Sequence, residues 1–119
     1  MATNRDTIAA LINGSVFKNY SYSFSFTTFS GSGSMSLDAS DSAGGRGIGI
    51  YINNYTGVRT YTIAGAGVDT AVFEYFGVPH HVSSGSLQVV AVSDSFIQGR
   101  FTLTADTFSI TNGVFNYKQ

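Results

Sequence analysis

The two histidines of this 119-residue chain, His80 and His81, are adjacent. Imidazole is the commonest metal ligand and titrates near neutral pH, so this pair is a natural first place to look for chemistry. Neighbouring side chains in an extended segment point to opposite faces, so the two rings would not share one metal, and the local spacing suggests no third ligand. We therefore expect a solvent-exposed loop pair, with pH-sensitive contacts as its remaining role.

Hard oxygen ligands are concentrated at residues 38–42, Asp-Ala-Ser-Asp-Ser, where the composition of residues 39–45 predicts an exposed loop. Calcium accepts such ligands, which makes Asp38 and Asp41 a weak candidate calcium site. The run lacks the glutamate that closes an EF-hand loop, because the twelfth position is Gly49. A turn in which Asp and Ser bond their own backbone explains the same residues, so no cofactor is predicted.

Catalytic motifs give no positive signal. Serine, histidine and aspartate all occur, but no Gly-x-Ser-x-Gly elbow links a strand to a helix. A carboxylate pair for glycoside cleavage would need Glu74, the only glutamate, and one of six aspartates, and sequence separation does not measure their distance. Residues 44–47, Gly-Gly-Arg-Gly, resemble an anion-binding loop, but no helix N-terminus follows them. We expect a non-enzymatic protein.

Aromatic residues are the unusual feature, with ten Phe and seven Tyr. Residues 20–26, Tyr-Ser-Tyr-Ser-Phe-Ser-Phe, place the rings on one face of a strand and the serines on the other. The change from Tyr to Phe predicts Phe24 and Phe26 in the core and the tyrosines nearer a rim. Tyrosine is enriched where a surface meets sugar rings, another protein or a neighbouring subunit, and small serines permit close packing. The candidate interface or ligand contacts are Tyr20, Tyr22, Tyr51, Tyr55, Tyr117, Ser21 and Ser23.

Period-two alternation recurs along the chain, and no stretch of ten or more residues has helical apolar spacing. We count about nine or ten short strands, a spacing typical of an antiparallel sandwich or small barrel. Asn13-Gly14 predicts a tight hairpin turn, whereas Asn112-Gly113 is expected to interrupt the last strand. The fold class is therefore all-β, a single antiparallel β-sandwich or small β-barrel with little or no helix.

Alternation also predicts which side chains fill the core and where the backbone is bare. Gly47 and Gly49 alternate with isoleucines, so one face of that strand would let another backbone or a large ring approach closely. Besides Phe24 and Phe26, the predicted core residues are Met35, Leu37, Phe73, Phe101, Leu103 and Phe108. Ile48, Ile50 and Ile52 share one face of their strand, and Tyr61 and Ile63 share one side of theirs.

Composition points to one β-domain over residues 1–119 with a weakly charged surface. The charged fraction is 11%, less than half of the roughly 25% of an average globular domain, and the formal net charge is −1. Such a chain has no basic patch that would bind nucleic acid or an anionic membrane. A net charge near zero also favours self-association, because little repulsion keeps copies apart. There is no cysteine, no apolar leader at the start, and no run long enough for membrane insertion.

Several sequence motifs resemble those of an uncharacterised family of small bacterial β-rich domains. They are residues 8–14 followed by Phe17, residues 61–63, residues 99–105 and residues 110–115. The resemblance spans nearly the whole chain, and the family's members look like exported proteins or lipoproteins. It implies a β-rich fold and an extracellular or cell-surface location, but no active site. The chain departs from the lipoprotein pattern in having no cysteine.

These observations predict a non-enzymatic extracellular structural, self-assembly or adhesion module that forms a homo-oligomer or filament. It would associate through strand edges and Tyr/Ser/Gly-rich faces, because residues 20–26 lack the charges that discourage edge pairing. Residues 1–7 could form an arm that pairs with a neighbouring subunit. The alternative is a β-domain that binds a carbohydrate or a small apolar ligand, revealed by a Tyr-lined cleft or an open barrel interior.

Overall fold

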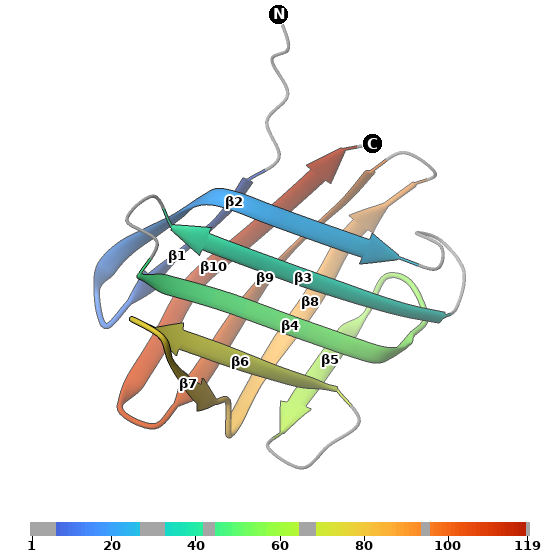
Figure 1. Ribbon diagram of the computed structural model, residues 1–119. Helices are drawn as coiled ribbons and strands as arrows, with labels where there is room; N and C mark the ends of the chain where they lie inside the picture. Colours follow the sequence, from blue (N-terminus) through green and yellow to red (C-terminus); the bar gives the residue numbers. More distant parts are fainter. Residues whose placement is uncertain (1–6, 27–32, 42–44, 65–68, 94–95, 119) are drawn as a thin grey trace, which may run out of the picture.

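The computed structural model describes residues 7–26, 33–41, 45–64, 69–93 and 96–118, with side chains for all of these except 7, 19–26 and 118 (Figure 1). The described residues form ten strands and no helix, which confirms the all-β prediction. The strands are β1 (Thr7–Ile12), β2 (Ser15–Phe26), β3 (Gly33–Asp41), β4 (Arg46–Tyr55), β5 (Thr60–Ala64), β6 (Thr70–Tyr75), β7 (Val78–His81), β8 (Ser84–Val92), β9 (Phe96–Ala105) and β10 (Phe108–Lys118).

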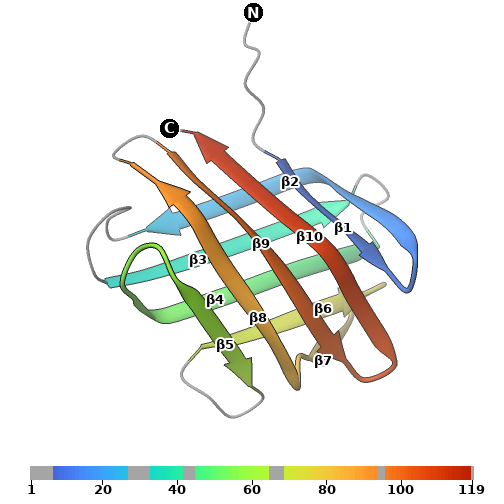
Figure 2. The same cartoon turned by 180° about the vertical axis from the view of Figure 1, so that it is seen from behind.

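The strands form two antiparallel layers in the order β5-β8-β9-β10-β1-β2-β3-β4-β6-β7. The long strand β2 connects the layers, because residues 15–18 pair with β1 and residues 19–26 pair with β3. Figures 1 and 2 show the layer of β3, β4 and β6 crossing the layer of β8, β9 and β10 at a steep angle. No ladder joins β5 to β7 within the described residues, so the fold is sandwich-like and not a closed barrel.

The core lies between the layers and is built from the inward residues of the alternating strands. Phe73 of β6 meets Phe108 of β10 across the layers, with their ring centroids 4.8 Å apart. Of the predicted core residues, Met35, Leu37, Phe73, Phe101 and Leu103 are buried, and Phe108 is partly buried against them. The inward residues of β4 and β5 are buried as well: Ile48, Ile50, Ile52, Tyr61 and Ile63. The side chains of Phe24 and Phe26 lie outside what the structure describes.

The hairpin predicted at Asn13-Gly14 is confirmed. Both residues have positive φ, 49° and 83°, as a tight two-residue turn between twisted strands requires. The Asn13 backbone N–H donates to the Ser109 carbonyl, and Asn13 Oδ1 accepts from the Ser109 N–H, each at 2.8 Å. The turn is therefore fastened to the neighbouring strand β10.

The loop predicted for residues 39–45 begins later than expected. Strand β3 continues to Asp41, and both Ala39 and Asp41 are buried. Loop-like composition was misleading here, because Ala39 contributes to the core and the Asp41 carboxylate is held by a cationic partner, Arg46. Residues 42–44 lie outside the described part of the chain.

The interruption predicted at Asn112-Gly113 is wrong, because β10 runs through it as a bulge. The register with β9 shifts between Ile110 and Gly113, and Asn112 has φ 52°. A Cβ built on Gly113 would lie 2.5 Å from the ring of Phe101, so glycine is needed where this ring lies against the backbone. Residues 1–6 of the proposed arm lie outside the described residues, and Thr7 begins β1.

Candidate functional site

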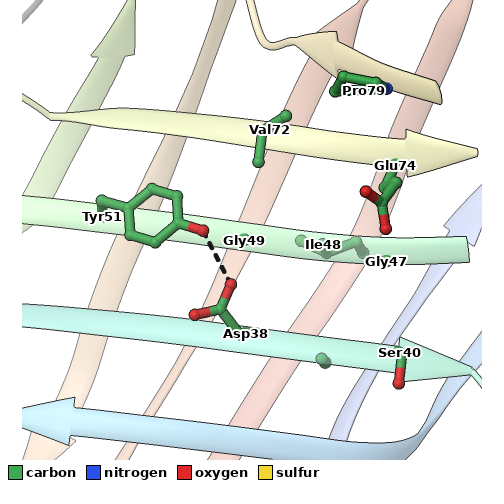
Figure 3. A pocket seen from close by; sticks show the side chains of 10 residues that line it. Asp38, Ser40, Gly47, Ile48, Gly49, Tyr51, Val72, Glu74 and Pro79 are labelled. Atoms are coloured by element: carbon green, nitrogen blue, oxygen red, sulfur yellow. Dashed lines mark hydrogen bonds between the residues drawn. The ribbon is translucent and has the colours of Figure 1, made fainter. Parts of the chain in front are cut away.

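A groove crosses the outer face of the layer formed by β3, β4, β6 and β7 (Figure 3). Its floor is the backbone of Gly47 and Gly49, because both glycines face outward on β4 while Ile48 between them faces inward. The walls rise from the strands on either side, and the volume is about 360 Å³. We call it the β4 groove, and its principal residues are Asp38, Ser40, Gly47, Gly49, Tyr51 and Glu74.

Tyr51 closes one end of the β4 groove. Its ring lies along β4 rather than standing upright from it, and Figure 3 shows the ring nearly face-on. The hydroxyl donates a hydrogen bond of 2.8 Å to Asp38 Oδ1 on the neighbouring strand. The ring is therefore pinned to the sheet with one face toward the groove.

Gly49 is the residue that permits this arrangement. A Cβ built there would lie 2.5 Å from the Tyr51 hydroxyl and 2.8 Å from Asp38 Oδ1. Gly47 is different, because its nearest neighbours would be the Ala39 carbonyl at 3.4 Å and the Glu74 Cβ at 3.7 Å. Alanine is thus accommodated at Gly47 but displaces the pinned tyrosine at Gly49.

The groove has an acidic electrostatic character. Asp38 and Glu74 supply two carboxylates, and none of the lining residues is lysine or arginine. Burial raises the pKa of Tyr51 to about 12, and the hydrogen bond to Asp38 and the charges of Asp38 and Glu74 act in the same direction. Tyr51 is therefore a neutral hydrogen-bond donor at physiological pH.

Alkaline titration tests this environment. The folded state holds the Tyr51 proton above the ordinary pKa of 10.0, so stability should fall as the pH rises from about 10 through about 12. We expect Asp38→Asn to lower the Tyr51 pKa part of the way toward 10 and to reduce that loss, since burial remains. Tyrosine ring NMR signals followed against pH provide the measurement, and an unchanged Tyr51 pKa in Asp38→Asn would contradict the arrangement.

The structure separates the two aspartates of the candidate calcium site. Asp38 faces the groove, whereas Asp41 faces inward and is only 5% exposed. Arg46 Nε donates to Asp41 Oδ2 at 2.6 Å, and the backbone N–H groups of Gly45 and Arg46 donate to Asp41 Oδ1. The two carboxylates do not converge on one point, and no group of three or more potential metal ligands occurs within the described residues.

The two histidines lie on strand β7, and not in the exposed loop that we predicted. His80 is half-buried, with Nδ1 2.5 Å from Asp106 Oδ2 and its ring against Phe108. His81 is exposed, and it pairs with Val72 at the border of the outer face. Their divergence agrees with the expected alternation, so they form no common site.

Tyr55 requires a correction, because it is 0% exposed and cannot contact a ligand or a partner. It stacks on Tyr61, with ring centroids 5.8 Å apart, and burial followed by the influence of Tyr61 raises its pKa to about 12. Alternation from Ile52 would place Tyr55 outside. A bulge in β4, where the register with β3 shifts, rotates it into the core.

The remaining predicted contacts lie on other strands. Tyr117 of β10 is half-buried and packs against the core in the opposite layer. The backbones of Tyr20, Ser21, Tyr22 and Ser23 belong to β2, but their side chains lie outside what the structure describes. Of the predicted contacts with described side chains, Tyr51 is therefore the one in the groove.

Sequence reasoning missed that Asp38, Tyr51 and Glu74 form one site. The alternating glycines of β4 did signal a surface that a large ring could cover, and period two places Tyr51 on it. In the sequence Glu74 is only an isolated acid, because Asp38 and Tyr51, which line the groove with it, lie on strands distant along the chain.

The fold and the groove together define an all-β, sandwich-like domain with a glycine-floored acidic groove on one outer face. No family model, curated protein or solved structure matches the chain. Within the described residues, no helix has the length and apolar character needed to cross a bilayer.

Proposed function

We propose that the protein is a non-enzymatic extracellular adhesion module that associates with a second copy of itself through one edge of β2. This edge, the side of residues 19–26 that faces away from β3, is called the margin of β2. The observation that supports this most is the pairing of residues 19–26. Their ladder runs to β3, and the ladder to β1 has ended at Lys18. Within the described residues, no strand pairs with their other side, and Figure 1 shows β2 along the margin of its layer.

The margin of β2 differs from the two ends of the strand order. The strands at those ends are only four and five residues long, and β7 contains Pro79. Short strands and proline are devices that discourage edge pairing. Residues 19–26, Asn-Tyr-Ser-Tyr-Ser-Phe-Ser-Phe, have no charge and no proline, so they retain the pairing capacity of a free edge.

Pairing β2 with its copy in an antiparallel sense would make a two-fold symmetric dimer. The two-fold axis of such a pair is perpendicular to the sheet, so both outer faces, with their β4 grooves, would lie on the same side. Two sites on one side bind a repetitive surface more tightly than one through effective concentration, which suits adhesion. The isologous contact closes on itself, so a filament would need a second interface.

A lysine placed on the margin tests the proposal. We expect wild-type protein to show a concentration-dependent monomer–dimer equilibrium in sedimentation velocity and Ser23→Lys to remain monomeric, because a charge on the edge opposes pairing. Ser23 is directly opposite Asp38, an exposed residue, so the change is made where the partner residue is not in the core.

Thr62→Lys on the edge strand β5 is the matched control, and it should dimerise like the wild type. A wild type that stays monomeric at every concentration would refute the proposal. Equal loss of dimer in both lysine variants would also refute it, since the effect would then reflect general charge rather than the β2 margin.

A further inference from the structure

We infer that the β4 groove is a binding site for uncharged carbohydrate, with Tyr51 as its stacking platform. The inference goes beyond self-association and does not depend on it, since every residue of the groove comes from one chain. At about 360 Å³ the groove is within the size range of small-molecule sites.

The aromatic ring is positioned for stacking. A tyrosine standing on a sheet presents its edge, but Tyr51 lies down over Gly49 and presents a face. The face of an aromatic ring carries partial negative charge, and it attracts the weakly positive C–H groups on the apolar face of a pyranose. The bond to Asp38 fixes the ring in this position before any ligand arrives, which reduces the entropy lost on binding.

The polar groups around that ring are mainly hydrogen-bond acceptors. Asp38 and Glu74 are exposed carboxylates, and ionised carboxylates only accept hydrogen bonds. Ser40 adds a hydroxyl that both donates and accepts. Each sugar hydroxyl can donate one hydrogen bond as well as accept, so neighbouring sugar hydroxyls can donate to the acceptors on both sides of the glycine floor.

The charge of the groove selects against acidic sugars. With two carboxylates and no lysine or arginine among its lining residues, the groove would repel a sugar that carries its own carboxylate or sulfate. The same charges also attract cations, but the site has only two acidic groups with a fixed aromatic face between its walls. A bare metal ion would find too few ligands there, because no group of three or more potential metal ligands occurs within the described residues.

Affinity electrophoresis followed by calorimetry on the full chain provides the test. The probes are a neutral glucan, mannan, galactan and xylan, with polygalacturonate as the acidic polysaccharide and calcium chloride as the cation. We expect binding to at least one neutral polysaccharide and to its oligosaccharides, and no binding to polygalacturonate.

Variants assign the binding to the groove. Tyr51→Ala should weaken it about tenfold or more through loss of the stacking face, and Tyr51→Phe should retain most of it. Gly49→Ala should reproduce the loss by displacing the ring and Asp38 while the fold is retained, which the thermal unfolding curve verifies. Phe76→Ala removes an aromatic residue that is 64% exposed outside the groove, and it should bind like the wild type.

Three results would overturn the inference. They are binding to none of the neutral polysaccharides, equal weakening by Tyr51→Ala and Phe76→Ala, and a groove that binds calcium or polygalacturonate in preference to neutral sugar. Each of these is separate from the state of association, because sedimentation of the same samples reports the dimer independently.

Discussion

Replacing Phe73 by alanine is expected to lower the free energy of unfolding by about 3–5 kcal/mol, the largest effect of any single change proposed for this protein. Phe73 is 0% exposed and connects the two layers, since its ring lies 4.8 Å from that of Phe108 on the opposite layer. Truncation removes the transfer free energy of the ring and leaves a cavity that the flanking strands cannot fill.

Urea denaturation of wild type and variant measures this change. Phe76→Ala provides the matched control, because the same side chain is lost at a turn where it is 64% exposed. We expect that control to stay within about 0.5 kcal/mol of the wild type. Similar losses from both variants would contradict the two-layer core described above.

The second large effect is expected from Arg46→Ala, with a loss of about 3 kcal/mol. Arg46 Nε bonds to buried Asp41 at 2.6 Å, and Arg46 Nη2 donates to the Val16 carbonyl on β2 at 2.9 Å. Removing the guanidinium leaves the Asp41 carboxylate buried without its cation, which costs more than the pair itself contributes. Arg100→Ala, on an exposed arginine of β9, should change the stability by about 0.5 kcal/mol or less.

The Asp41–Arg46 pair also predicts an acid dependence. Burial by itself raises the pKa of Asp41, but the Arg46 and Gly45 hydrogen bonds and the Arg46 charge outweigh it and lower the pKa below 3.8. The pair therefore stabilises the fold above about pH 4 and loses this contribution as the pH falls through the folded-state pKa. Denaturation at pH 7 and pH 3 should show a smaller difference between wild type and Arg46→Ala at the lower pH, and a constant difference would contradict this account.

Sequence alone predicted the fold class because period-two alternation directly reports which face of a strand is buried. The isoleucines of β4 and the Asn13-Gly14 turn show this well, since burial and backbone conformation there depend on neighbours along the chain. Alternation failed at Tyr55, and turn chemistry failed at Asn112-Gly113, for one reason. A bulge changes the phase of a strand, and period two contains no information about where a partner strand forces one.

The groove could not be predicted because its walls meet through topology. After β4 the chain enters the opposite layer as β5 and returns as β6 beside β4, which places Glu74 opposite Gly47. Nothing local to Glu74 indicates that return. The glycine pattern of β4, in contrast, was a local signal that another backbone or a large ring could approach this face closely, and the Tyr51 hydroxyl lies against Gly49 there.

The self-association of β2 is tested most directly by hydrogen exchange of residues 19–26 at low and high protein concentration, since this measurement needs no substitution. Amides on the free side of an edge exchange rapidly, and pairing with a second copy protects them. We predict that exchange in residues 19–26 slows as the concentration rises, while exchange in β5 and β7 stays the same. Exchange in residues 19–26 that is independent of concentration would contradict the proposal.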